Sequence, residues 1–279
     1  MTTITVPRLP AGRTVRLGLS RIVNEVRAYF RQGDSVFFTC LFPLVMLTIF
    51  ATAFSNQSFG TDASGNEVSA AAYYLPGMLA AGLLFSGLQN LAVDIATERS
   101  DGTLKRLAGT PLPVVSYFIG KIGQVLVTGA AQAALLLIVA GVLFGVALPT
   151  AVEAWFTFAW VFLLGVTTSA VLGIALSRLP RTGKSATAVV IPITLVLQFI
   201  SGVYLSFSML PEWLQNIANA FPLKWMAQGM RAVFLPENYE SEEPGGTWNL
   251  IGVLIATSAW LVVGLVVCRL TFRWIRKDS

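Results

Sequence analysis

The sequence has 279 residues, of which 55% are hydrophobic and 12% are charged, and its mean hydropathy is +0.70. Soluble domains carry about 25% charged residues, so the composition excludes an ordinary soluble protein and predicts a membrane protein. The net charge of +5 is distributed in a way that fits a membrane better than nucleic acid, and we expect no nucleic-acid partner. Histidine is absent, and Cys40 and Cys268 lie in apolar runs, which predicts buried thiols rather than a disulfide.

Residues 1–34 form an N-terminal segment with an amphipathic pattern. Between Arg13 and Arg31, apolar residues recur at spacings of three and four, as on one face of a helix; these are Val15, Leu19, Ile22, Val26, Tyr29 and Phe30. The arginines fall mainly on the opposite side. We expect a helix near residues 13–32 that lies in the membrane interface with its arginines among lipid headgroups. The alternative is a soluble helix that covers another domain, and the chain offers no soluble domain to cover.

Six apolar runs are long enough to cross a bilayer, which takes about 20 helical residues. They are residues 35–54, 73–96, 114–148, 155–176, 186–206 and 248–270. We therefore expect an all-α membrane protein in which residues 35–279 form one six-span domain. The third run is too long for a straight crossing, so it is expected to tilt or to project beyond the membrane.

The basic residues predict how the spans are oriented. Cytoplasmic loops are enriched in Lys and Arg. Of the 19 basic residues, 17 fall in the N-terminal segment, in or beside the loops after the second and fourth runs, and in the C-terminal segment. Only Lys224 and Arg231 fall on the other side. Both termini are therefore expected in the cytoplasm.

The loop between the second and third runs, residues 96–121, is unusually charged for this chain. A short helix is expected to begin at Asp101-Gly102-Thr103 and to end before Pro111, because proline lacks a backbone N–H. One side of this helix is apolar and the other basic, and the residues concerned are Leu104, Leu107, Lys105 and Arg106. Such a helix suits a cleft in a cytoplasmic partner. The alternative is an ordinary basic cytoplasmic loop with a turn at its prolines.

Asp94 and Glu98 lie one helical turn apart at the end of the second run. Acidic groups in spans are costly and often functional, so a proton relay is one interpretation. Ion pairing with Arg99, Lys121 or the N-terminal arginines is the interpretation that we favour.

The segment between the fifth and sixth runs, residues 206–247, is too long for a simple connector. It contains Pro211, Pro222 and Pro236, and it has an apolar stripe at helical spacing that is formed by Trp213, Leu214, Ile217, Ala218 and Phe221. This pattern predicts external helices that turn back toward the outer leaflet. The acidic residues near Glu240, followed by Pro244-Gly245-Gly246, indicate a solvated loop.

Two stretches carry a resemblance to a known family. The first comprises Glu98, Gly102, Thr103, Leu104, Leu107, Thr110, Pro111, Leu112, Pro113, Tyr117, Gly120 and Lys121. The second comprises Ser201, Gly202, Val203, Tyr204, Leu210, Pro211, Glu212, Trp213, Leu214, Pro222 and Arg231. With the size, the six spans and the preceding interfacial helix, they resemble the ABC type-2 permeases. These are the membrane subunits of bacterial ATP-driven exporters, including drug exporters of the daunorubicin-resistance type and polysaccharide exporters.

The resemblance implies a division of labour. Residues 98–108 would form a coupling helix that rests in a groove of an ATPase subunit, with contacts from Glu98, Arg99, Asp101, Gly102, Thr103, Leu104, Lys105, Arg106 and Leu107. The N-terminal helix would be the connecting helix beside it. Two permeases would assemble with two ATPases in the bacterial cytoplasmic (inner) membrane. We expect a homodimer, with a heterodimer of related permeases as the alternative, and ATP and Mg bound to the ATPase only.

The residues themselves also point to a separate ATPase. Gly183-Lys184-Ser185 ends like a phosphate-binding loop, but that motif needs a glycine where Arg178 stands, and Pro180 interrupts the stretch. A basic turn is the better interpretation. We predict no catalytic residue, no cofactor and no metal site in this chain.

The transport path has weaker signals. In the family the second and fifth spans line the central cavity, which implies path residues at Phe85, Gln89, Asn90, Gln198 and Phe199, and an external gate at Val203 and Tyr204. For each polar residue the alternative is a hydrogen bond that joins helices inside the bundle. A hydrophobic drug is the expected cargo, and a polysaccharide or lipid-linked glycan is the alternative. An ATPase-independent transporter or a structural membrane protein ranks lower, because the sequence shows no coupling-ion site near the midplane.

Overall fold

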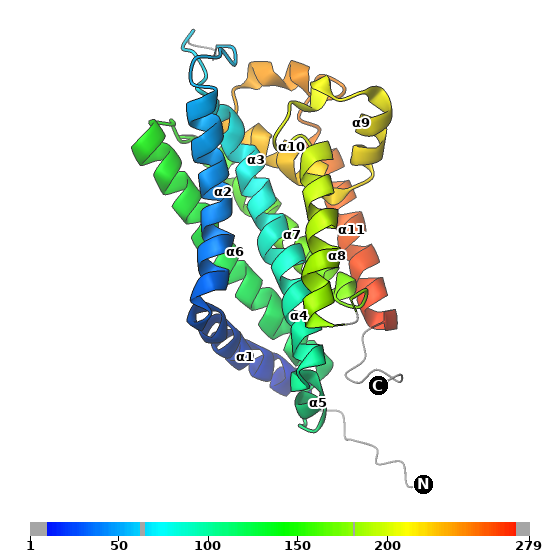
Figure 1. Ribbon diagram of the computed structural model, residues 1–279. Helices are drawn as coiled ribbons and strands as arrows, with labels where there is room; N and C mark the ends of the chain where they lie inside the picture. Colours follow the sequence, from blue (N-terminus) through cyan, green and yellow to red (C-terminus); the bar gives the residue numbers. More distant parts are fainter. Residues whose placement is uncertain (1–9, 62–64, 181, 272–279) are drawn as a thin grey trace.

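The structure is a computed structural model that describes residues 10–61, 65–180 and 182–271. Those residues fold into a helical bundle (Figure 1). In chain order the elements are α1 (Ala11–Arg31), α2 (Gly33–Ala53), α3 (Ala70–Leu84), the π-helical turn η1 (Phe85–Asn90), α4 (Leu91–Ser100), α5 (Thr103–Ala108), α6 (Val114–Phe144), α7 (Val152–Leu176), α8 (Gly183–Ile200), η2 (Phe207–Met209), α9 (Glu212–Asn219), α10 (Pro222–Phe234), η3 (Glu237–Glu242) and α11 (Leu250–Thr271).

Five helices of the described chain are long and apolar enough to cross a membrane. They are Ala70–Ser100, which joins α3, η1 and α4, and α6, α7, α8 and α11. A shorter apolar helix, Thr39–Ala53, lies within α2. The expectation of an all-α membrane protein is confirmed at this level. The sixth crossing, through α2, stays a prediction.

Two of the expected runs end earlier than predicted. The third run was expected to reach residue 148, but α6 ends at Phe144 because Gly145 adopts a left-handed conformation with φ +63°. Glycine takes that conformation without the steric cost that other residues meet. The fifth run was expected to reach residue 206, but α8 ends at Ile200, and the chain then makes an irregular turn from Ser201.

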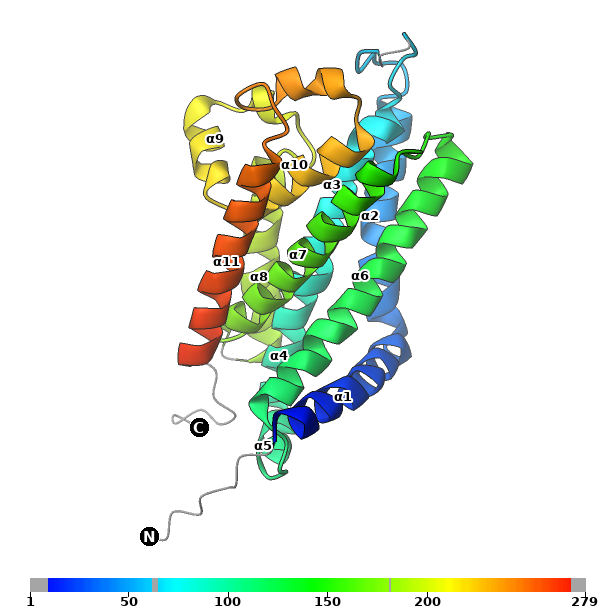
Figure 2. The ribbon, with the colours of Figure 1, turned by 180° about the vertical axis from the view of Figure 1, so that it is seen from behind.

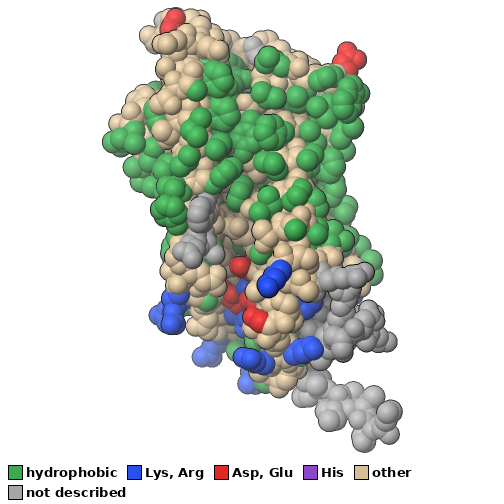
Figure 3. Space-filling model, viewed as in Figure 1, with side chains coloured by type: hydrophobic (Ala, Val, Ile, Leu, Met, Phe, Trp, Pro, Cys, Tyr) green, Lys and Arg blue, Asp and Glu red, His purple; other side chains and the backbone are tan. Residues whose placement is uncertain are grey.

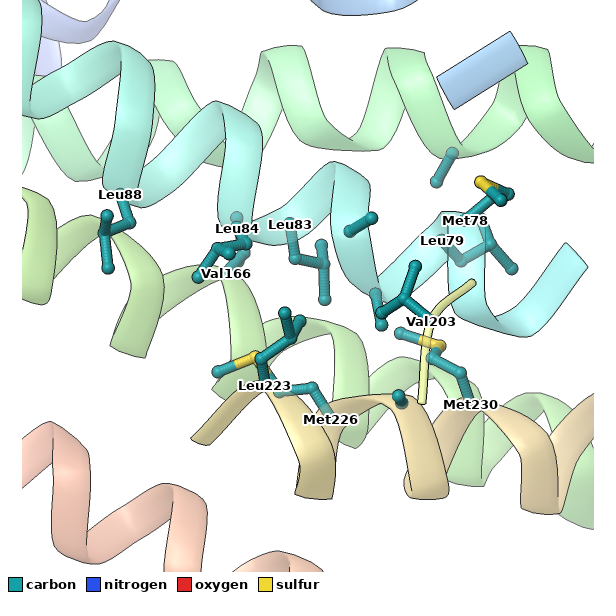
Figure 4. Close-up of a cluster of buried hydrophobic side chains, with 14 of the residues drawn as sticks. Met78, Leu79, Leu83, Leu84, Leu88, Val166, Val203, Leu223, Met226 and Met230 are labelled. Carbon is teal, nitrogen blue, oxygen red and sulfur yellow. The ribbon is translucent and has the colours of Figure 1, made fainter. Parts of the chain in front are cut away.

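The central helix α3–η1–α4 contributes more buried apolar residues to the core than any other helix. Nearly every residue of α3 is buried, whereas only four residues of α11 are. Figure 4 shows Leu79 and Leu83 of α3 close to Met226 and Met230 of α10, beside Val166 of α7. The outer helices present apolar side chains to their surroundings, as lipid-facing helices do.

The exposed Lys and Arg side chains gather at one end of the bundle, which we call the basic end (Figure 3). Its exposed basic residues are Arg13, Arg16, Arg27, Arg31, Lys105, Arg106, Lys184 and Arg269. α1 lies across this end, α5 forms its tip, and the last turn of α11 also reaches it. α9, α10 and η3 lie at the opposite end (Figure 1). Helices are thus present where external ones were expected.

Candidate functional site at the basic end

α5 is a short helix at the tip of the basic end, and its first residues explain why it forms there. Asp101 accepts a hydrogen bond of 2.9 Å from the backbone N–H of Thr103, and Gly102 takes the left-handed conformation with φ +83°. This N–H holds the pKa of the Asp101 carboxyl below its ordinary value. The preceding helix is therefore broken, and a new one starts in another direction.

α5 has one anchored side and one free side. Leu104 is fully buried and Leu107 is half-buried, so both attach the helix to the bundle. Lys105 and Arg106 are exposed. The predicted division into an apolar and a basic side is confirmed.

The predicted single helix over residues 98–108 is wrong. Glu98 and Arg99 belong to the last turn of α4, and the break at Asp101-Gly102 separates them from α5. Arg99 donates to the backbone oxygen of Ser177 at 2.7 Å and so ties α4 to the end of α7. These two residues therefore hold helices together, and only the residues from Thr103 onward lie on the protruding helix.

Beneath α5, a buried ion network joins α1, α4 and α6. The Lys121 Nζ lies 2.9 Å from Glu25 Oε2 and 2.5 Å from Glu98 Oε1. Arg21 pairs with Glu25 at 2.7 Å, and Tyr117 donates to Glu98 at 2.7 Å. Lys121 is only 2% exposed. The expected pairing of Glu98 with Lys121 is confirmed.

The network fixes α1 against α6. The guanidinium of Arg21 lies 5.1 Å above the Tyr117 ring, and Ser116 donates to the backbone oxygen of Thr14 at 2.7 Å. Val15, Leu19 and Phe30 stay about half-exposed on another side of the helix. The predicted amphipathic helix is present. α6 covers part of the apolar stripe of α1, and the rest of the stripe stays exposed. The reason is that α6 crosses α1 at an angle and so contacts only part of its apolar face.

A cleft of about 320 Å³ lies beside this network. Its walls include Glu25, Asp94, Glu98, Asp101 and Lys121. Figure 3 shows acidic side chains in a hollow among the basic ones. Residues of both α1 and α4 line the cleft, and Lys121 of α6 bridges the two helices beside it through its ion pairs with Glu25 and Glu98.

The predicted path residues of the second span, Phe85, Gln89 and Asn90, all lie in the π-helical turn η1. Such turns insert one extra residue into a helix and are frequent at functional sites. Gln89 accepts a 2.6 Å hydrogen bond from Thr194 of α8, and Asn90 donates at 2.7 Å to Thr39 of α2. Phe85 stacks on Phe42 with 5.0 Å between ring centroids. These side chains thus contact neighbouring helices, as the alternative interpretation expected, and their role in a transport path stays a prediction.

The predicted gate residues lie at the opposite end of the bundle and are buried. Val203 is 2% exposed, and Figure 4 places it beside Met78 of α3. Tyr204 is 5% exposed and donates a hydrogen bond to Gln198, which is itself buried. Phe199 differs, because it is 47% exposed. Their role in transport stays a prediction.

A second ion pair supports this opposite end. Arg231 of α10 pairs with Glu243, and its Nη1 donates at 3.2 Å to the backbone oxygen of Gly202. Both side chains are almost buried. The pair thus links the connection before α11 to the turn that follows α8.

Sequence reasoning missed three contributors to these two ion networks. The sequence analysis assigned no role to Glu25, because it described the N-terminal helix by its arginines and apolar residues. Tyr117 was noted only as part of a motif, and Glu243 was assigned to a solvated loop. The useful signal for Glu25 was an acidic residue four positions after Arg21 on a helix that otherwise carries only basic charges. No comparable signal marked Glu243.

Comparison with protein families matches residues 57–271 to the family described as ABC-2 family transporter protein. The matched range covers more than half of the chain and includes α3 to α11, whereas α1 and α2 precede it. A comparison with curated proteins found no match.

Proposed function

The chain belongs to the ABC-2 family of transporter proteins, and from this membership we propose that it is the permease subunit of an ATP-driven exporter. It is a multi-pass membrane protein whose apolar helices form the transmembrane part of an ABC transporter. Membrane subunits of this family are not themselves catalytic. A separate ATPase therefore supplies the energy, and this chain converts the motion of that ATPase into movement of its own helices.

The observation that carries the proposal is the form of α5. The helix stands at the tip of the basic end, is anchored by Leu104, and presents Lys105 and Arg106 outward. A rigid, charged projection suits a groove on a partner, since rim charges steer association and fix its register. The basic end is then the cytoplasmic side, in agreement with the enrichment of Lys and Arg in cytoplasmic loops.

Force applied to α5 has a direct route into the bundle. α5 follows α4 after a break of two residues, and α4 is tied to α6 through Glu98–Lys121 and to α7 through Arg99–Ser177. We infer that displacement of α5 moves α4 and α6 together. The π-helical turn η1 is the point at which α4 can bend relative to α3, because its hydrogen-bond pattern already departs from the regular helix.

The working unit that we propose contains two permeases and two ATPases in a bacterial cytoplasmic membrane. α2 and α8 flank the central helix on the face seen in Figure 1, and both expose large apolar side chains, among them Ile49 and Phe199. A second copy on this face would cover them and enclose a shared path. A homodimer is the simplest arrangement.

The cargo that we propose is a hydrophobic or amphipathic small molecule taken from the cytoplasm or the inner leaflet. The support is the resemblance of the two motif stretches to drug-exporting permeases. A lipid-linked glycan or polysaccharide is the second candidate. ATP-dependent accumulation of a lipophilic fluorescent dye in inverted vesicles would support the first, and ATPase stimulation by a lipid-linked glycan alone would support the second.

The coupling role is tested by copurification of a P-loop ATPase with this chain. We expect Arg106→Glu to reduce the copurified ATPase at least tenfold, because it reverses an exposed charge on α5. Lys184→Glu is the matched control, since it reverses an exposed charge at the same end on α8 and should keep the ATPase bound. Transport by the isolated chain without ATP, or equal loss in both variants, would overturn the proposal.

A further inference from the structure

The cleft beside the ion network is formed by three helices at the basic end. Figure 2 shows α1 lying across the lower part of α6, with α4 beside them and α5 at the tip. Each helix contributes lining residues three or four positions apart, which share one helical face: Glu25 and Tyr29 of α1, Asp94 and Glu98 of α4, and Lys121 and Gln124 of α6. Three helical faces therefore meet at one cleft, whose volume of about 320 Å³ suits a small molecule.

Most of the charge beside this cleft is already paired. Lys121 lies between one oxygen of Glu25 and one oxygen of Glu98. The other oxygen of Glu25 pairs with Arg21, and the other oxygen of Glu98 accepts from Tyr117. All four carboxylate oxygens thus have partners, and the two negative charges are balanced by two positive ones.

Asp94 adds a negative charge that this network does not balance. It is half-buried and lines the cleft, yet within residues 10–61, 65–180 and 182–271 it forms neither an ion pair nor a hydrogen bond. The pairing expected for both Asp94 and Glu98 is therefore found only for Glu98. Burial raises the pKa of Tyr29 to about 12, and the nearby carboxylate of Asp94 adds to that shift. Asp94 thus acts electrostatically on the α1 side of the cleft.

Gln124 is the second unpartnered group in the cleft. It is only 4% exposed, and its side-chain amide forms no hydrogen bond in the part of the chain that the structure describes. An amide removed from water without a partner costs free energy, so it favours a ligand that supplies one.

Asp94 and Gln124 lie at the same level of the bundle. Glu98 of α4 touches Lys121 of α6 at 2.5 Å, and the two helices run in opposite directions on either side of α5. Asp94 is four residues before Glu98 and Gln124 is three residues after Lys121, so each lies about one turn farther from the basic end. The free carboxylate and the free amide therefore flank the same part of the cleft.

We propose that this cleft binds the ammonium group of a small organic cation, with Asp94 as its counter-ion, the Gln124 oxygen as a second acceptor and the Tyr29 ring as an aromatic wall. An ammonium group carries three N–H donors, which carboxylate and amide oxygens accept. A cation is also attracted to the face of a tyrosine ring. Ca²⁺ takes six to eight oxygen ligands and Mg²⁺ an octahedral set, more than these two side chains supply.

A cation in this cleft would add a link between helices. α1 packs mainly on α6, whereas α4 packs mainly on α8. The ion pairs of Lys121 already bridge α1 and α4, and a cation held by Asp94 and Gln124 would join α4 to α6 one turn deeper. We therefore infer that the ligand stabilises this end of the bundle. The inference goes beyond the proposed function, because that function assigns no ligand to the cleft and binding needs no ATPase.

The proposal is tested by isothermal titration calorimetry of the full-length chain in nanodiscs at neutral pH. The probes are phenethylamine, which is protonated there, and 2-phenylethanol, which has the same skeleton with a neutral hydroxyl group. We expect the parent protein to bind the amine at least tenfold more tightly than the alcohol. Asp94→Asn should lose that preference, and Gln124→Met should weaken amine binding at least threefold. Glu212→Gln, which removes an exposed carboxylate at the opposite end, is the control and should keep the preference.

Thermal unfolding provides a second measurement. The amine should raise the melting temperature of the parent protein and leave that of Asp94→Asn unchanged, because only a ligand that binds the folded chain stabilises it. Without ligand, Asp94→Asn should melt no lower than the parent, so that its loss of binding does not reflect unfolding. Equal affinity for amine and alcohol, or unchanged amine affinity in Asp94→Asn, would overturn the proposal. Displacement of the amine by equimolar MgCl2 would overturn it as well, because the site would then prefer a metal ion. None of these results depends on copurification of an ATPase, so the proposal fails or stands apart from the coupling role.

Discussion

Substitution of Lys121 by methionine tests the ion network that joins α1, α4 and α6. Methionine keeps most of the length and apolar volume of the lysine side chain but removes the charge. In the parent protein the ammonium lies within 3 Å of both Glu25 and Glu98 and is almost fully buried. After substitution, these two carboxylates face each other without their shared counter-ion.

The magnitude follows from the contacts that remain. Loss of one partner from a buried ion pair costs about 3–5 kcal/mol. Arg21 still pairs with Glu25 at 2.7 Å, and Tyr117 still donates to Glu98 at 2.7 Å, so we expect the lower end, about 3 kcal/mol. At roughly 2–4 °C per kcal/mol for domains of about 150–250 residues, the melting temperature should fall by roughly 6–12 °C.

The assay is thermal unfolding of the purified protein in detergent, followed by tryptophan fluorescence. Lys121→Met combined with Glu98→Gln should recover part of the loss, because the second substitution removes the carboxylate charge that would otherwise lie buried without its counter-ion. Arg106→Glu is the matched surface variant and should change stability by no more than about 0.5 kcal/mol. A Lys121→Met protein that melts within 2 °C of the parent, or a double variant that shows only the sum of the single effects, would refute the reasoning.

Two further predictions concern the crossing at η1 and the opposite end of the bundle. Gly173→Ala would place a Cβ 2.3 Å from the backbone oxygen of Gly87, and a backbone atom cannot move aside as the end of a flexible side chain can. We therefore expect the variant to lose at least about 1–3 kcal/mol of stability and to melt at a clearly lower temperature. Gly12→Ala is the control, because its added Cβ meets nothing within 4 Å. Burial lowers the pKa of Lys224 to about 8, with Glu243 opposing and Arg231 adding to the shift. Between pH 8 and pH 10 the unfolded chain therefore binds more protons at Lys224 than the folded chain does, so the melting temperature should rise with pH. This rise should vanish in Lys224→Met. An equal rise in that variant would contradict the assignment to Lys224.

The sequence predicted features that depend on neighbouring residues. Runs of apolar residues predicted the long helices, and a helix that begins near Asp101-Gly102-Thr103 with one apolar and one basic side was correctly expected. The error lay in extending that helix back to Glu98. The break depends on the left-handed conformation of Gly102, which composition does not reveal, so the last turn of α4 was joined to α5.

Polar residues inside the spans were harder to interpret. Gln89 and Gln198 were expected along a path, and in the chain they accept hydrogen bonds from Thr194 and Tyr204. A glutamine in a span must satisfy its amide somewhere, and the same residue serves either a cavity or a neighbouring helix. The choice depends on which helices face each other, and helical spacing alone does not specify this.

What the sequence determined by itself was the membrane class, the approximate helices and the gathering of basic residues, because each is a property of segments about 20 residues long. Only the tertiary structure decided that Glu25 on α1 and Glu98 on α4 share Lys121, that a π-helical turn interrupts the central helix, and that an apolar groove lies between α7, α8 and α11. The physical reason is separation along the chain. Ion pairs and grooves form between residues tens to more than a hundred positions apart, and their geometry exists only once the helices have packed.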